Sequence, residues 1–137
     1  MIVRTLVAVA LLVVAQAPGA SAAPPPLAPI DVFALQWADN PVLSPDGRKL
    51  VYERQFFDTM KDVRRSNLWL VDSASGAAQP LTTGSVADGQ AAWSPDATRI
   101  AYVSSDEGKA QIFVRWLSSG ATARITQLER GPSNLAW

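Results

Sequence analysis

Short apolar runs alternate with turn residues along most of this chain. From Asn40 onward, segments such as RKLVYER and TRIAYVS hold short apolar runs, and an extended chain with a period of two would place Leu50 and Tyr52 on one face and Val51 on the other. This period is typical of β-strands, whereas an amphipathic helix repeats its apolar residues every three to four positions. Segments rich in turn-forming residues, among them SPDG, SASG and SSG, separate the runs. The pattern predicts an all-β fold made of short strands.

The strand pattern occurs twice. LSPDGRKLVYER begins at Leu43 and WSPDATRIAYVS begins at Trp93, with Ser, Pro, Asp and Tyr in register. The two SPD motifs are 50 residues apart, whereas Gly76 and Gly120 in the later turns are 44 residues apart. The repeating unit is therefore 44 residues, and the first copy holds six more. A period of about 40–45 residues with four strands per unit is typical of β-propeller blades.

A third unit begins near the end of the sequence. Trp137 follows Trp93 by 44 residues and closes the segment GPSNLAW. We therefore expect a partial β-propeller, with two four-stranded antiparallel blades plus the first strand of a third. The predicted boundaries are 40–84 for blade 1, 85–128 for blade 2 and 129–137 for the start of blade 3.

The first residues carry a different signal. Arg4 precedes the apolar run TLVAVALLVVAQA, and Ala20 and Ala22 form the A-x-A pattern that signal peptidase cuts. We expect a signal peptide over 1–22, cleavage after Ala22, and a periplasmic or secreted protein of 115 residues. An uncleaved membrane anchor is the alternative, but it needs about 20 apolar residues and this run is shorter. The absence of Cys excludes a lipoprotein anchor.

Residues 23–39 are predicted to form a proline-rich spacer and a short helical lead-in. APPPLAP favours extended polyproline structure. Asp31 can cap a short helix, with Ile30 and Leu35 forming a hydrophobic staple around its first turn. Pro41 ends any such helix before the strands begin.

Composition narrows the chemistry that these residues can perform. The chain has no His and no G-x-S-x-G motif, which excludes a Ser-His-Asp site and His-ligated metals within it. After cleavage, 11 basic and 12 acidic residues remain, which is unlike a nucleic-acid binder. We therefore assign no catalytic, cofactor-binding or metal-ligating residue, expect no cofactor or nucleic-acid partner, and expect no membrane association after signal cleavage.

The repeated SPDG motif has the composition of a tight turn. Pro45 sets φ for the second turn position, Asp46 can accept hydrogen bonds from nearby backbone, and Gly47 permits the left-handed conformation. Ala97 replaces the glycine in the second copy, so that turn is either mildly strained or closed differently. Asp46 and Asp96 could instead bind a ligand or metal, but isolated carboxylates are weak evidence for this.

Apolar residues at matching positions of the two repeats are predicted to form the core. We expect several residues of both repeats to be buried as core, namely Leu43, Leu50, Tyr52, Trp69, Trp93, Ile100, Tyr102 and Phe113.

The six additional residues lie in a strand-connecting loop over 55–66, QFFDTMKDVRRS. This loop is either a recognition site or a solvated charged loop with its aromatic residues tucked beneath it. Its candidate residues are Phe56, Phe57, Asp58, Asp62, Arg64 and Arg65.

The ordered segments IDVFALQWADNPVLSPDGRKLVYE, NLWLVDSASGAAQPLTTG and AAWSPDATRIAYVSSDEGKAQIFV resemble the propeller of the prolyl oligopeptidase family. Among its branches, the secreted bacterial acylaminoacyl-peptidase and dipeptidyl-aminopeptidase-like enzymes are most similar. The resemblance covers residues 30–137. It implies an N-terminal propeller that restricts the access of peptide substrates to a C-terminal α/β-hydrolase domain with a Ser-Asp-His triad. None of those catalytic positions lies in this chain.

Two non-catalytic alternatives remain. One is a periplasmic TolB-like propeller that binds proteins, although such proteins place a sizeable α/β domain before the propeller and only 21 residues precede Ser44 after Ala22. The other is a secreted ligand-binding propeller of another kind. Because a closed propeller needs at least four blades, we expect the 115-residue product alone not to be a stable monomer.

Overall fold

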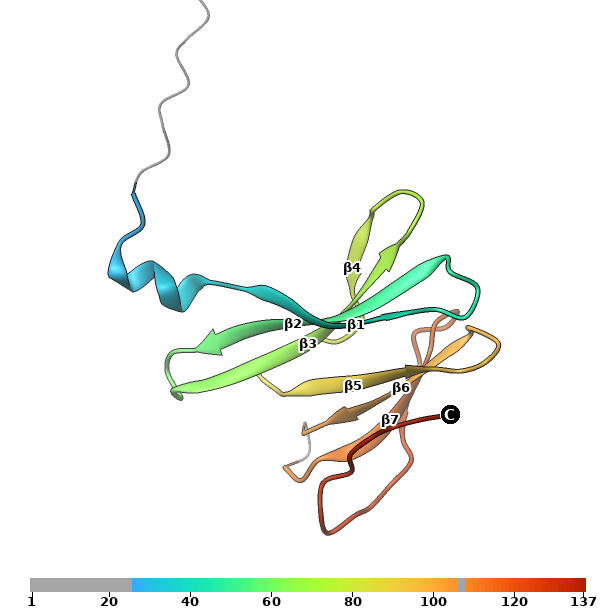
Figure 1. Cartoon of the computed structure of the whole chain (residues 1–137). Helices are drawn as coiled ribbons and strands as arrows, with labels where there is room; N and C mark the ends of the chain where they lie inside the picture. Colours follow the sequence, from blue (N-terminus) through green and yellow to red (C-terminus); the bar gives the residue numbers. More distant parts are fainter. Residues whose placement is uncertain (1–25, 106–107) are drawn as a thin grey trace, which may run out of the picture.

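The computed structural model describes residues 26–105 and 108–137, so the predicted signal peptide lies outside the described residues. One short 3₁₀-helix precedes a series of strands (Figure 1). The elements are η1 (Pro29–Ala34), β1 (Trp37–Leu43), β2 (Lys49–Asp58), β3 (Val63–Asp72), β4 (Ala78–Pro80), β5 (Asp88–Trp93), β6 (Arg99–Ser104), β7 (Gln111–Trp116) and β8 (Thr122–Arg124).

The strands form two antiparallel sheets of four strands each. Strand order follows chain order in both, β1-β2-β3-β4 and β5-β6-β7-β8, and the two sheets lie face to face (Figure 1). The predicted all-β fold with two four-stranded propeller blades is confirmed, and we call the sheets blade 1 and blade 2. No helix within the described residues is long and apolar enough to span a membrane.

A left-handed bulge marks the first strand of each repeat. The register of β1 shifts between Asp39 and Val42, and that of β5 shifts between Gly89 and Ala92. Within these shifts Asn40 and Gln90 have φ of 47° and 53°. Asn134, 44 residues after Gln90, has φ of 55°, so the third repeat begins with the same backbone feature.

Tryptophan links each repeat to the preceding one. The Nε1–H of Trp93 donates to the carbonyl oxygen of Val42 in blade 1 at 3.0 Å. The Nε1–H of Trp137 donates to the carbonyl oxygen of Ala92 in blade 2 at 2.9 Å, which is the same contact one repeat later. Residues 129–137 repeat these features without pairing as a strand.

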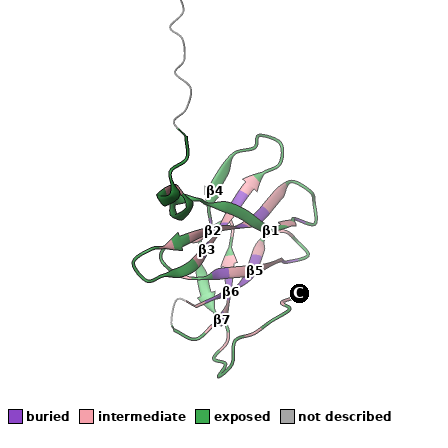
Figure 2. Cartoon of the chain, turned by 60° about the vertical axis from the view of Figure 1, so that its left-hand side comes forward, coloured by how far each residue is buried: buried purple, intermediate pink, exposed green. Residues whose placement is uncertain are grey.

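The core lies between the two blades. Val51, Leu68 and Leu70 of blade 1 meet Trp93 and the apolar face of blade 2, and all are at most 8% exposed. The remaining members of this cluster are Leu81, Ile100, Tyr102 and Phe113. Buried positions therefore gather at the contact between the sheets, whereas the far side of blade 1 is largely exposed or half-buried (Figure 2).

The predicted burial is correct for blade 2 and partly wrong for blade 1. Trp93, Ile100, Tyr102 and Phe113 are buried as expected. Leu43 is 58% exposed, and the other three predicted core residues, Leu50, Tyr52 and Trp69, are only half-buried. The reason is the direction of their side chains, because they lie on the face of blade 1 that points away from blade 2. No neighbouring sheet covers that face within the described residues.

The six additional residues lengthen a hairpin instead of forming a loop, which corrects the prediction for 55–66. Strands β2 and β3 each have 10 residues, whereas β6 and β7 each have six. Pairing continues from Lys49–Asp72 to Asp58–Val63, so only residues 59–62 form the turn. Cross-strand pairing satisfies the backbone polar groups that a solvated loop would leave to water.

The lead-in forms a single 3₁₀-helix, and its capping differs from the prediction. Asp31 lies inside η1, not at its N-cap, and its Oδ2 accepts the N–H of Ala28 at 2.7 Å. Ile30 and Leu35 are 69% and 51% exposed. The apolar side of this helix therefore stays available beside the hairpin.

Candidate functional site: a groove beside the β2–β3 hairpin

A groove of about 640 Å³ lies between η1 and the end of the β2–β3 hairpin. Two segments that are separate in the sequence build it, since the helix contributes one wall and the added hairpin residues contribute the other. Its lining consists of Ile30, Phe33, Ala34, Phe57, Asp58, Thr59, Asp62 and Val63. The fold thus joins the lead-in to three of the residues that sequence analysis selected.

Apolar side chains dominate the groove. Phe33 and Phe57 are 49% and 41% exposed, and Val63 is 37% exposed. The ring of Phe57 lies 5.6 Å from that of Trp37, in a tilted arrangement that stabilises aromatic pairs. Exposed aromatic and aliphatic side chains gathered at one place are typical of surfaces that contact another protein segment or an apolar ligand.

Two carboxylates, those of Asp58 and Asp62, line the groove. The Oδ1 of Asp58 accepts the N–H of Lys61 at 3.3 Å, across the hairpin turn. Asp62 closes the turn in the left-handed region, with φ of 52°. Within the described part of the chain, no three His, Cys, Asp or Glu residues gather as a metal site. The groove can therefore hold an apolar side chain, with the two carboxylates beside it.

The hairpin separates the remaining candidate residues, because neighbouring residues of a strand point to opposite faces. Phe57 lines the groove, whereas Phe56 lines a different cavity, together with Arg54 and Trp69. Arg65 pairs with Phe56 across the strands, and Arg64 is exposed. Sequence analysis missed Ile30 and Phe33. Their signal was the row of apolar residues in the lead-in, which no strand or long helix needed for its own packing.

The SPD turns use their carboxylates internally. In blade 1, the Oδ1 of Asp46 accepts the hydroxyl of Ser44 at 2.6 Å and the N–H of Arg48 at 3.1 Å. These bonds favour the charged carboxylate, and the Ser44 hydroxyl is the main cause of the lowered pKa of Asp46. Both copies therefore stabilise their own turn through the Asp side chain.

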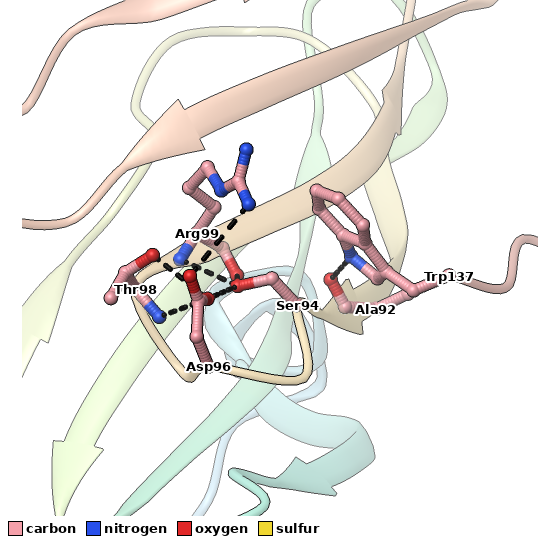
Figure 3. Close-up of polar contacts among 6 residues, drawn as sticks. All are labelled: Ala92, Ser94, Asp96, Thr98, Arg99 and Trp137. Carbon is pink, nitrogen blue, oxygen red and sulfur yellow. Dashed lines mark hydrogen bonds and ion pairs between the residues drawn. The ribbon is translucent and has the colours of Figure 1, made fainter.

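The second turn is more strongly bonded (Figure 3). The Oδ1 of Asp96 accepts the hydroxyl of Ser94 at 2.6 Å, and it accepts the N–H and hydroxyl of Thr98 at 3.1 and 2.8 Å. The Ser94 hydroxyl, followed by the two Thr98 groups, lowers the pKa of Asp96 to about 2. Ala97 adopts φ of 55°, so the Ala-containing turn closes like its Gly47 counterpart at 71°.

A buried glutamate joins the two blades, and sequence analysis did not select it. Glu53 is 7% exposed. Its Oε1 accepts the backbone N–H of Gln90 at 2.9 Å, and its Oε2 accepts the Nε2–H of Gln55 at 2.9 Å. Gly89 makes room for it, because a Cβ there would lie 2.8 Å from Oε1. The bulge of blade 2 is thus held by a carboxylate of blade 1.

Comparison with known proteins found one curated relative and several solved structures of similar fold. No family model matches the chain. The sequence is 29% identical over 108 residues to the uncharacterized peptidase YuxL of Bacillus subtilis (strain 168). This match covers 78% of the chain but only 16% of YuxL. The chain therefore spans about a sixth of the relative that it matches.

Solved structures of similar fold include peptidases and TolB proteins. Acylaminoacyl peptidase of Pyrococcus horikoshii has a TM-score of 0.64 at 13% identity, over 77% of this chain and 16% of its own. The β-propeller domain of the Trilobed protease from Pyrococcus furiosus has a TM-score of 0.58 at 14% identity, over 74% of this chain and 30% of its own. TolB from Acinetobacter baumannii has a TM-score of 0.54 at 24% identity, over 66% of this chain and 21% of its own. At these identities the likeness concerns the fold, which is that of consecutive blades of a β-propeller.

Proposed function

We propose that this chain is the N-terminal part of the propeller of a prolyl oligopeptidase family serine peptidase. The single observation that supports this most is the 29% identity to the uncharacterized peptidase YuxL over 108 residues, which is 78% of the chain. The ordered lead-in, blade and turn segments point to the secreted acylaminoacyl-peptidase and dipeptidyl-aminopeptidase-like branch. The substrates would be peptides, hydrolysed in a C-terminal α/β-hydrolase domain.

In this proposal the described residues control access and contain no reacting group. The chain contains no His, so a Ser-Asp-His triad would lie elsewhere in the complete protein. A propeller beside the hydrolase domain restricts which peptides reach the nucleophile, and rigid blades suit that role. The groove between η1 and the hairpin, with Phe33 and Phe57 exposed, is the part of this chain best suited to contact another segment.

The test is to express the complete reading frame that contains this chain. We expect a G-x-S-x-G serine followed by Asp and His, labelling of that serine by a fluorophosphonate, and hydrolysis of short acylated or free peptide substrates. A serine-to-alanine variant of that motif is the matched control for both measurements. A frame without the motif, or a purified protein that neither labels nor hydrolyses, contradicts the proposal.

A non-catalytic TolB-like propeller is the second candidate. The observation in its favour is 24% identity to TolB from Acinetobacter baumannii, which exceeds the identity to the solved peptidases. In that case the complete protein contains only further blades and binds a periplasmic protein. The same expression experiment separates the two functions, since only the peptidase acquires a serine that can be labelled.

Export is part of both proposals. We infer that the signal peptide is cleaved after Ala22 and that the protein acts in the periplasm or outside the cell. Fractionation of a producing bacterium, followed by N-terminal sequencing, should give a mature chain that begins APPPLAP. Recovery of the unprocessed protein from the cytoplasm contradicts this inference.

A further inference from the structure

The tip of the β2–β3 hairpin presents an apolar side chain to solvent. Met60 is 92% exposed, which is the largest exposed fraction among the large hydrophobic residues of the described part of the chain. The turn that carries it is held in place, because the N–H of Lys61 donates to the carbonyl oxygen and to Oδ1 of Asp58, at 3.2 and 3.3 Å. An unbranched Met side chain on a fixed, projecting turn is well suited to fill an apolar site of irregular shape.

This tip stands clear of the contact between the two blades. Strands β2 and β3 each have 10 residues and β6 and β7 each have six, so the hairpin extends beyond blade 2 on the side of η1 (Figure 1). The residues that meet blade 2, among them Glu53 and Leu68, lie further along the hairpin from its turn. Packing of blade against blade, as it occurs between these two sheets, therefore leaves residues 59–62 exposed.

The groove beside the tip has chemistry that complements the tip. Its lining is mainly apolar and includes the carboxylates of Asp58 and Asp62, whereas Met60 is not part of it. Lys61 follows Met60 directly and is exposed. Within residues 26–105 and 108–137, Lys61 takes part in no ion pair. The tip thus offers an apolar side chain next to a positive charge, and the groove offers an apolar lining next to negative charges.

A second copy of the protein matches this surface better than other occupants do. The tip and the groove lie side by side, so two copies related by a two-fold axis can each insert a tip into the other's groove, which closes the assembly. An anionic lipid surface would attract Lys61 but repel the carboxylates of the groove. A partner protein with charge of one sign would likewise match only one half of the surface.

We propose that two copies of the protein associate by reciprocal insertion of their hairpin tips. Met60 of each copy occupies the groove between η1 and the β2–β3 hairpin of the other copy, and Lys61 pairs there with Asp58 or Asp62. The inference does not depend on the proposed function, because a peptidase and a TolB-like propeller can both associate through this hairpin.

The test is sedimentation equilibrium of the complete protein, which we expect to form a dimer. Met60→Asp should raise the dimer Kd by at least about 30-fold, because it places a carboxylate in an apolar groove that already holds two. The matched control is Ala74→Asp, which adds the same charge in the exposed turn between β3 and β4 and should change Kd by less than about twofold. Because both positions are exposed, both variants should keep the Tm of the wild-type protein.

A charge exchange tests the pairing of Lys61. Lys61→Glu should weaken the dimer by about tenfold, because it brings like charges together, and adding Asp62→Lys to the same chain should recover most of that loss. A double variant that is no tighter than Lys61→Glu alone would contradict the pairing across the two copies.

Three results would refute the reciprocal insertion. One is a wild-type protein that stays monomeric up to about 200 µM. Another is a dimer that Met60→Asp does not weaken. The third is a monomer that binds anionic lipid vesicles and loses this binding in Met60→Asp, which would assign the tip to a lipid surface. Failure of the proposed function is distinguishable, because labelling of the predicted serine does not require association.

Discussion

Blade 1 and blade 2 have the same strand order and the same turn chemistry but different burial. Position by position, Leu43 is 58% exposed while its equivalent Trp93 is 7% exposed. Tyr52 is half-buried and its equivalent Tyr102 is 5% exposed. Because the local structures match, the difference in burial comes from the neighbouring sheets. Blade 1 covers this face of blade 2, whereas no sheet within the described residues covers the matching face of blade 1.

The comparison shows how stability is distributed in a repeat architecture. Each blade satisfies its backbone hydrogen bonds internally, but its side chains need an adjacent blade to become a core. The bond from Trp93 to Val42 and the bond from Gln90 to Glu53 both cross from blade 2 to blade 1. Interactions between repeats, more than those within them, therefore hold this pair together.

The largest expected effect comes from removing the tryptophan at the blade contact. Trp93→Ala should lower the free energy of unfolding by about 3–5 kcal/mol, because it empties a buried site and removes the indole N–H that donates to the Val42 carbonyl. Leu43→Ala, at the equivalent position of blade 1, should cost less than about 1 kcal/mol if that side chain stays 58% exposed. Urea denaturation of the complete protein, followed by far-UV circular dichroism, measures both.

The proposed function changes the expectation for Leu43. If a further blade of the complete protein covers the face of blade 1 that points away from blade 2, Leu43→Ala should instead cost about 2 kcal/mol or more. A loss below about 1 kcal/mol would show that this face stays exposed. A loss for Trp93→Ala as small as that for Leu43→Ala would mean that the contact between the two blades is not their main stabilising interface.

The second effect concerns the glycine that makes room for the buried carboxylate. Gly89→Ala should cost about 1–3 kcal/mol, since the new Cβ would lie 2.8 Å from Oε1 of Glu53. The repeat offers a matched control, because blade 1 has Asp39 at the same position. There, Asp39 is exposed and its Oδ1 accepts the N–H of Asn40 locally, so Asp39→Ala should change stability much less.

A double-mutant cycle in urea denaturation tests the cause. Glu53→Ala removes the atoms that the new methyl group would meet, so the costs of Gly89→Ala and Glu53→Ala should not add. We expect the double variant to be more stable than the sum by about 1 kcal/mol or more. Additive losses would mean that Gly89 is needed for its backbone and not for the space that it leaves.

The sequence predicted the repeat well because the repeat depends on local rules. The strand pattern, the SPD turn and the 44-residue spacing from Trp93 to Trp137 can all be identified in the sequence without knowing which strands lie side by side. Burial on a given face is not local. Leu43 and Trp69 look like core residues in the sequence, but their exposure depends on whether another sheet lies opposite, which their own neighbours do not encode.

The candidate site was predicted only in part for a related reason. Phe57, Asp58 and Asp62 were selected, but an insertion of even length could extend a hairpin as readily as form a loop, and the pairing of Asp58 with Val63 decided this. Glu53 was missed because a glutamate in an alternating strand usually faces solvent. The available clue was Gly89 within a strand, which often marks a close approach of other atoms.

The smallest expected effect separates the two SPD turns through their acidity. Hydrogen bonds from Ser94 and Thr98 lower the pKa of Asp96 from the ordinary range of a carboxyl group to about 2, while Asp46 lacks the second hydroxyl. Because the folded-state pKa of Asp96 is the lower one, its stabilising contribution is complete above about pH 4 and is lost as the pH falls toward 2. The destabilisation caused by Asp96→Asn should therefore shrink across that window. Carboxyl NMR titration should give a lower pKa for Asp96 than for Asp46. Thr98→Ala should bring the two pKa values together, because it removes the second hydroxyl. An unchanged difference in that variant would assign the lower pKa of Asp96 to Ser94 or Arg99 instead.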